Sequence, residues 1–139
     1  MMQDDFGRCE KRIRDKRIVL EEKRSSITFV NNCRKRVRRI EVDDCVITEG
    51  KRCDYLLVTP EKTEYYVELK GKNVGHGVKQ IEATINKLSA DKRQRPKLAF
   101  VIATRYPLAG TDIQKHQERF KNIYSAKLLF PRPNSEIEL

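Results

Sequence analysis

No stretch of this sequence stays apolar for the roughly 20 residues that a helix needs to cross a bilayer. The N-terminal segment MMQDDFGRCEKRIRDKR also lacks the apolar core of a secretory signal. No basic amphipathic helix with an aromatic face stands out, so a membrane surface is a poor candidate partner. These absences favour a cytoplasmic protein with no membrane partner.

Several motifs that would point to other functions are also missing. The sequence has no CxxC pair among Cys9, Cys33, Cys45 and Cys53, so a zinc site has little support and reduced, partly buried thiols are expected. No GxxxxGK[ST] phosphate loop is present, which removes the nucleotide cradle of that type. Aromatic residues make up 7% of the chain and form no stacking platform, so RNA is a weaker candidate partner than DNA.

What the chain has in excess is positive charge. Lys and Arg together number 30 against 20 for Asp and Glu, which gives a formal net charge of +10. Such an excess attracts polyanions, and each phosphate that Lys or Arg neutralises releases condensed counterions. Nucleic acid is therefore the first candidate partner, although a merely basic, soluble protein would have the same composition.

The densest basic cluster follows the Asn31-Asn32 turn. We interpret it as a contact to the phosphate backbone that positions the substrate without reading its sequence. A solvated hairpin tip is the competing interpretation. The cluster comprises Arg34, Lys35, Arg36, Arg38 and Arg39.

A length of 139 residues fits one domain over 1–139. Hydrophobic periodicity and turn residues predict a helix, several antiparallel strands, then helix, strand, helix and strand. This order predicts an α/β fold with a central mixed sheet flanked by helices, and from about residue 131 a tail that can be mobile. The expected helices are 9–23, 78–90 and one that Thr111 caps, and the expected strands are 25–30, 34–47, 53–59, 64–70, 98–103 and 127–130.

A pair of carboxylates is the strongest chemical signal. Glu68 and Lys70 share one face of the strand 64–70, because side chains alternate along a strand. If 60–62 is a three-residue hairpin loop, Asp54 lies directly opposite Glu68, with the two Cβ atoms ~4.5–5.5 Å apart. Two carboxylates this close repel each other unless a cation or a proton lies between them. A divalent metal between Asp54 and Glu68 is therefore expected, unless these residues form only a salt-bridged surface.

Phosphodiester hydrolysis is the chemistry that uses such a site. Carboxylate oxygens suit Mg²⁺, with Mn²⁺ as a substitute, and a bound ion polarises the phosphoryl group and lowers the pKa of a water. Lys70 follows Glu68 by ~7 Å along the strand and would orient the attacking water.

The string CDYLLV, a hairpin, YYVELKG and then a helix carrying Gln80 resemble the PD-(D/E)XK nuclease superfamily, which includes Holliday-junction resolvases and many restriction endonucleases. The resemblance spans about 42–103, and Cys53 stands where the pattern has Pro. It implies a restriction-endonuclease-like core. It also implies metal ligation by Asp54, Glu68 and the backbone carbonyl of Leu69.

The same resemblance makes Lys70 the catalytic lysine and places Gln80 near the metal or the attacked phosphate. Many members take a further carboxylate from the first helix, and Glu21, Glu22 and Glu41 all stay open for that role. Lys72, His76 and Lys79 flank the glycine-containing loop after the predicted catalytic strand, where they can contact nucleic acid.

The sequence thus predicts a metal-dependent endonuclease acting on DNA. A catalytically inactive nucleic-acid-binding module of the same fold is the alternative, and a basic structural protein is a third possibility. The chain has no room for a separate target-recognition domain, so a homodimer or a partner protein stays open.

Overall fold

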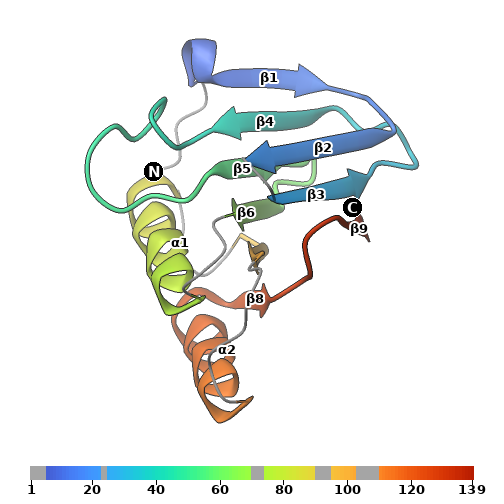
Figure 1. Cartoon of the computed structure of the whole chain (residues 1–139). Helices are drawn as coiled ribbons and strands as arrows, with labels where there is room; N and C mark the ends of the chain where they lie inside the picture. The colour runs from blue at the N-terminus through green and yellow to red at the C-terminus, as the bar shows by residue number, and fades with distance from the viewer. Residues whose placement is uncertain (1–5, 23–24, 70–73, 90–94, 103–109) are drawn as a thin grey trace.

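The computed structural model describes residues 6–22, 25–69, 74–89, 95–102 and 110–139. Strands dominate the first half of the chain, and two helices follow in the second half (Figure 1). In chain order the elements are η1 (Gly7–Cys9), β1 (Glu10–Ile13), β2 (Arg17–Glu22), β3 (Ser25–Val30), β4 (Val37–Glu41), β5 (Tyr55–Val58), β6 (Glu64–Glu68), α1 (Val74–Leu88), β7 (Lys97–Val101), α2 (Gly110–Tyr124), β8 (Ala126–Leu129) and β9 (Ser135–Glu138).

The strands form two sheets. The six-stranded sheet has the order β1-β4-β5-β6-β7-β8, and the three-stranded sheet has the order β2-β3-β9. The large sheet is mixed, because β1, β4, β5 and β6 pair antiparallel while β6, β7 and β8 pair parallel. An α/β fold with a central mixed sheet is therefore confirmed.

The large sheet has a different cover on each face. Leu56 and Tyr66 point to one face and pack with Ile81 of α1 and Phe120 of α2. On the opposite face, the alternating residues of the same strands pack against the small sheet, as the edge-to-face contact of Tyr65 with Phe29 shows, with 5.8 Å between ring centroids. Helices flank one face as predicted, but a second sheet rather than a helix covers the other.

The helix predicted over 9–23 is wrong. This segment forms β1 and β2, and Ile18 and Leu20 are buried while Arg17, Val19 and Glu21 are exposed. Burial therefore repeats every second residue, which is the period of a strand. The strand predicted over 34–47 is also too long, because β4 ends at Glu41 and an Asp-Asp pair, unfavourable within a strand, follows shortly after.

Two of the four cysteines form a disulfide, so the prediction of reduced thiols is wrong for this pair. Cys9, in η1, is bonded to Cys45, in the segment after β4, with 5.7 Å between their Cα atoms. Cys33 is a free, exposed thiol and Cys53 a free, buried one. The sequence separation of 36 explains why no local spacing indicated the bond.

The C-terminal segment, for which the sequence predicts a tail, contains β9. This strand pairs in parallel with β3, and Leu139 N donates to Val30 O at 3.0 Å. Arg17 also forms an ion pair with Glu136 at 2.8 Å. Within the described ranges, no helix has both the length and the apolar character to span a bilayer.

Candidate metal centre

The hairpin between β5 and β6 has the predicted register. Thr59 N donates to Thr63 O at 3.1 Å, which closes the three-residue loop 60–62. Tyr55 pairs with Val67, and Asp54, which precedes β5, donates from its N to Val67 O at 3.0 Å. The predicted three-residue loop is therefore confirmed, and the paired register ends one residue before the two carboxylates.

Both carboxylates are buried. Asp54 is 2% exposed and Glu68 0%. The Oδ2 atom of Asp54 accepts a hydrogen bond from Leu69 N at 2.7 Å, so the contact that Leu69 makes to Asp54 runs through its amide. A hydrogen bond from a backbone N–H to a carboxylate stabilises the ionised form, as a metal ligand requires.

Helix α1 comes close to Glu68 because Gly77 has no side chain. A Cβ at position 77 would lie 2.9 Å from Val101 Cγ1 and 3.4 Å from Glu68 Cγ. The glycine therefore permits the first turns of α1 to pack directly on the ends of β6 and β7. Glu68 is covered by this helix rather than by solvent.

Two further carboxylates from separate parts of the chain converge on Asp54. Glu22, Asp43 and Asp54 each offer one oxygen, and these oxygens all lie within 4.8 Å of one another. Glu22 ends β2, Asp43 follows β4 and Asp54 precedes β5. Acidic groups this close fit a divalent cation with oxygen ligands, because the cation removes their mutual repulsion.

Backbone contacts fix two of these residues. Val42 N and Asp43 N both donate to Asp54 O, at 3.0 and 3.4 Å, so the segment after β4 runs beside Asp54. The end of β2 is placed by the hydroxyl of Tyr55, which donates to Glu21 O at 3.5 Å. Of the three residues left open by the sequence, Glu22 is the one whose carboxylate joins Asp54.

Glu41, at the end of β4, lies near the same group. Burial raises the pKa of Tyr55, and the charges of Glu41, Glu22 and Asp54 raise it further, while Arg39 opposes them. Several negative groups therefore act on one phenol at this end of the sheet. Among the described residues, the group of three within 4.8 Å does not include Glu41 or Glu68.

Asp43 was not identified from the sequence. It lies in the segment 34–47, which the sequence predicts to be one strand. That prediction gives no reason to place the Asp43 side chain beside Asp54. The signal was the Asp43-Asp44 pair itself, which is typical of a strand end. In the structure Arg52 holds both residues, with Nε 2.7 Å from Asp43 Oδ1 and Nη2 2.8 Å from Asp44 Oδ1.

Gln80 is buried on α1, at 9% exposure. Its Oε1 accepts from Arg52 N at 3.1 Å. One turn later, Thr84 Oγ1 accepts from Cys53 N at 2.8 Å. These two side chains hold the backbone of the two residues before Asp54, so the helix positions the carboxylate. Burial also raises the pKa of the Cys53 thiol well above its usual range.

The predicted site residues that follow Leu69 are described only in part. Lys70 and Lys72 lie outside the described residues. His76 and Lys79 are exposed in the first turns of α1, which begins at Val74, so His76 lies in the helix rather than in the loop predicted before residue 78.

The basic cluster lies at the other end of the large sheet. Val37 begins β4 and Glu41 ends it near Asp54, so Arg34–Arg36 are separated from the carboxylates by the length of the strand, about 17 Å. Arg38 forms a bidentate pair with Glu10, and Lys35 is paired with Glu61 at 2.8 Å. The five residues therefore do not form one continuous surface beside the carboxylates.

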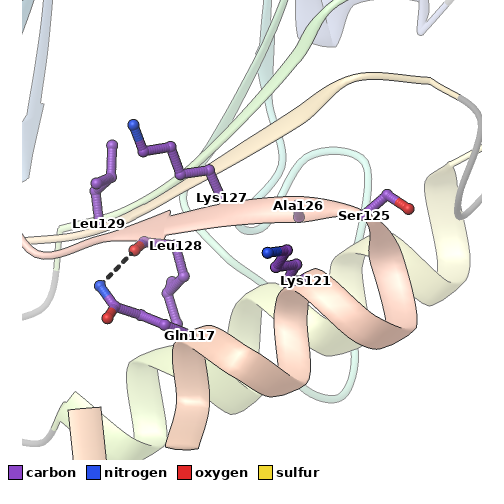
Figure 2. A pocket seen from close by; sticks show the side chains of 7 residues that line it. All are labelled: Gln117, Lys121, Ser125, Ala126, Lys127, Leu128 and Leu129. Carbon is purple, nitrogen blue, oxygen red and sulfur yellow. Dashed lines mark hydrogen bonds between the residues drawn. The ribbon is translucent and has the colours of Figure 1, made fainter. Parts of the chain in front are cut away.

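A hollow lies elsewhere again. It has a volume of about 650 Å³ and runs along the edge strand β8, between Gln117 and Lys121 of α2 and residues 125–129 (Figure 2). Gln117 Nε2 donates to Leu128 O at 3.0 Å, which caps a carbonyl of this edge strand. None of the predicted site residues lines this hollow. The convergent carboxylates, not this hollow, are therefore the candidate site.

In comparisons with known proteins, no family model, curated protein or solved structure matches the chain.

Proposed function

We infer that this protein is a metal-dependent endonuclease that hydrolyses phosphodiester bonds of DNA, with a restriction-endonuclease-like core of the PD-(D/E)XK type. The observation that carries this proposal is the burial of Asp54, just before β5, and of Glu68, at the end of the neighbouring β6. Glu22 at the end of β2 and Asp43 after β4 each bring a carboxylate oxygen close to that of Asp54. Acidic side chains from four separate segments at one end of a sheet are costly for folding unless a cation joins them.

The carboxylates of Asp54, Asp43 and Glu22 would hold Mg²⁺ or Mn²⁺, and Glu68 would complete the site from beneath α1. When bound, the ion polarises the phosphoryl group and supplies a water of lowered pKa. Lys70 follows Glu68 in the sequence and would orient this water and offset negative charge in the transition state. Gln80 and Thr84 keep the segment before Asp54 in place through its backbone N–H groups.

DNA is the proposed substrate because of the net charge of +10 and because aromatic residues, which stack on the bases of single-stranded RNA, make up only 7% of the chain. An inactive nucleic-acid-binding module of the same fold would keep the charge but would have no use for the buried carboxylates. The proposal therefore depends on the metal, and the test must separate cleavage from binding.

The test is cleavage of duplex, single-stranded, flap and four-way-junction DNA, plus RNA, in Mg²⁺, Mn²⁺ or EDTA. Wild-type protein should cut DNA only with the metal, and Asp54→Asn should bind but not cut. Asp44→Asn is the matched control, because Asp44 is an exposed neighbour that lies outside the group of three. Tight binding without cleavage under any metal would replace the nuclease by the inactive module.

A further inference from the structure

The end of the large sheet opposite the carboxylates gathers three turns that are far apart in the sequence. They are 14–16 between β1 and β2, 31–36 between β3 and β4, and 59–63 between β5 and β6 (Figure 1). Asn31 N donates to Lys16 O at 2.6 Å, which joins the first turn to the second. The ion pair of Lys35 with Glu61, at 2.8 Å, joins the second to the third.

These turns are strongly basic. They contain six basic residues and two acidic ones, which leaves four net positive charges at one end of a small domain. Lys35 is already paired with Glu61, so the remaining basic side chains carry the surface charge. Those that the structure shows as exposed are Arg14, Lys16, Arg34, Arg36 and Lys62.

The dimensions of this surface suit a nucleic-acid backbone. The turns cap the adjacent strands β1, β4, β5 and β6, and four strands at ~4.8 Å spacing span about 15 Å. One strand of B-DNA presents a phosphate about every 3.4 Å of helix axis, so roughly four phosphates face such a span. The net charge of the turns therefore matches the phosphates within reach.

We propose that the turns 14–16, 31–36 and 59–63 form one surface that binds the phosphate backbone of duplex DNA. Thr59 follows Asp54 by five steps of extended chain, so the surface lies about 17 Å, or about five base pairs, from the carboxylates. The distance from this surface to a DNA cleavage site has meaning only if the proposed nuclease function holds. DNA binding by the surface does not depend on that function.

A lipid surface fits these turns less well than DNA. Proteins that lie on anionic membranes insert large apolar side chains beside their basic ones. In the described part of the chain, the large apolar side chains that are exposed are Val19 and Ile123, and neither belongs to the three turns. The surface offers charge without an apolar anchor, as contacts to a phosphate backbone require.

The test measures binding of a fluorescent 20-base-pair duplex in EDTA across a salt titration, so that cleavage plays no part. One exposed residue is neutralised in each turn, as the triple variant Arg14→Gln, Arg34→Gln, Lys62→Gln. Each lost phosphate contact should lower the log–log salt slope by about 0.9, and the Kd at low salt should rise about tenfold or more. The matched control, Lys115→Gln, Lys121→Gln, Lys127→Gln, removes the same charge from exposed positions on α2 and β8 and should keep the slope.

Cys33 gives a second readout in the unmodified sequence, because it is an exposed free thiol within the second turn. A thiol-linked photo-crosslinker at Cys33 should attach to the duplex. An unchanged slope in the turn variant, an equal loss in the control, or vesicles of anionic lipid that bind to the turns in place of DNA would each overturn the proposal. If the turn variant loses binding while wild-type protein never cuts, this surface is retained and the proposed nuclease function fails.

Discussion

The guanidinium of Arg38 forms two hydrogen bonds with the carboxylate of Glu10, from Nη2 to Oε1 at 2.8 Å and from Nε to Oε2 at 3.0 Å. Arg38 also lies over the ring of Phe6, 5.8 Å from its centroid. The two charged side chains are 15% and 5% exposed. Arg38 therefore anchors the edge strand β1 to β4, although the sequence assigns it to the basic cluster that contacts DNA.

Replacing Arg38 by Gln should lower the free energy of unfolding by about 2 kcal/mol at neutral pH, because it removes the bidentate partner of a largely buried carboxylate and leaves it the single contact from the half-exposed Arg12, at 3.2 Å. Urea unfolding measures this change. Arg36→Gln, at an exposed neighbour, should stay within about 0.5 kcal/mol of wild type. Equal, small effects of the two variants would mean that Arg38 has no structural role.

The same pair predicts a pH dependence. The Arg38 guanidinium holds the pKa of Glu10 below its usual range in the folded state, so the ionised form stabilises the fold. This contribution is present above the unfolded pKa and is lost as the pH falls through the folded pKa. The difference between wild type and Arg38→Gln should therefore shrink on acidification. A difference that is constant from neutral to acid pH would contradict it.

Glu64 should show the opposite pH dependence. It is fully buried, and burial raises its pKa even though Tyr66 and Ser89 donate hydrogen bonds to Oε1, at 2.8 and 3.0 Å. A raised folded pKa contributes stability below the unfolded pKa that is lost as the pH rises through the folded one. Glu64→Gln keeps an acceptor for both hydroxyls and cannot titrate. Its stability relative to wild type should rise with pH across the acid range, and a flat difference would show that Glu64 does not titrate there.

The part of the site that the sequence predicted depends on one turn. A loop of three residues fixes the parity of the two strands, and the pairing runs as predicted from Val58 with Glu64 to Tyr55 with Val67. Asp54 lies just before β5, where its N donates to Val67 O at 3.0 Å. Local geometry was therefore enough to bring the segments of the two carboxylates together.

The part that the sequence missed depends on contacts between distant segments. Glu22 and Asp43 reach Asp54 only because β2 folds over the large sheet and β4 ends early. In β2, exposed charged residues lie between the apolar ones, and this mixture resembles the polar side of a helix. The two-residue spacing of Ile18 and Leu20, which is typical of a strand, was therefore overlooked. Because the segment 9–23 was predicted as a helix, Glu22 was not placed at the end of a strand, where the structure has it.

The Cys9–Cys45 disulfide should contribute about 4 kcal/mol to stability, given the 36-residue separation of the two cysteines. The double variant Cys9→Ser, Cys45→Ser should lower the urea midpoint accordingly, and Cys33→Ser should leave it unchanged because Cys33 is exposed and free. Thiol titration of the denatured, unreduced protein checks the pairing directly. It should find the thiols of Cys33 and Cys53 only, and four free thiols would refute the bond.

Helix α1 packs closely on the end of the large sheet that carries the carboxylates. This contact predicts that changes at Gly77 and Val101 have coupled effects on stability. Gly77→Ala should gain about 1 kcal/mol of helix propensity but lose more, since its Cβ would lie 2.9 Å from Val101 Cγ1. We expect a net destabilisation of about 1–2 kcal/mol. Adding Val101→Ala removes the clashing methyl group, so the double variant should be more stable than the sum of the single changes predicts. Additive effects in urea unfolding would show that Gly77 is not tightly packed there.

The group formed by Glu22, Asp43 and Asp54 predicts that Mn²⁺ stabilises the folded protein. A ligand that binds only the folded state raises the free energy of unfolding by about 2.7 kcal/mol at 100 times its Kd, so the Tm should rise with Mn²⁺ and return in EDTA. Asp43→Asn and Glu22→Gln each remove one charged ligand from the group within 4.8 Å and should weaken Mn²⁺ binding by about tenfold or more in calorimetry.

Glu41→Gln is the matched control, because Glu41 lies at the same end of the sheet but outside that group. It should keep the Mn²⁺ affinity of wild type apart from a small long-range effect. If Glu41→Gln weakens binding as much as Asp43→Asn, the ion is attracted by the general negative charge of this edge and not by a defined set of ligands. If none of the three variants changes the affinity, the ion binds elsewhere, and the buried pair of Asp54 and Glu68 must be explained without a metal.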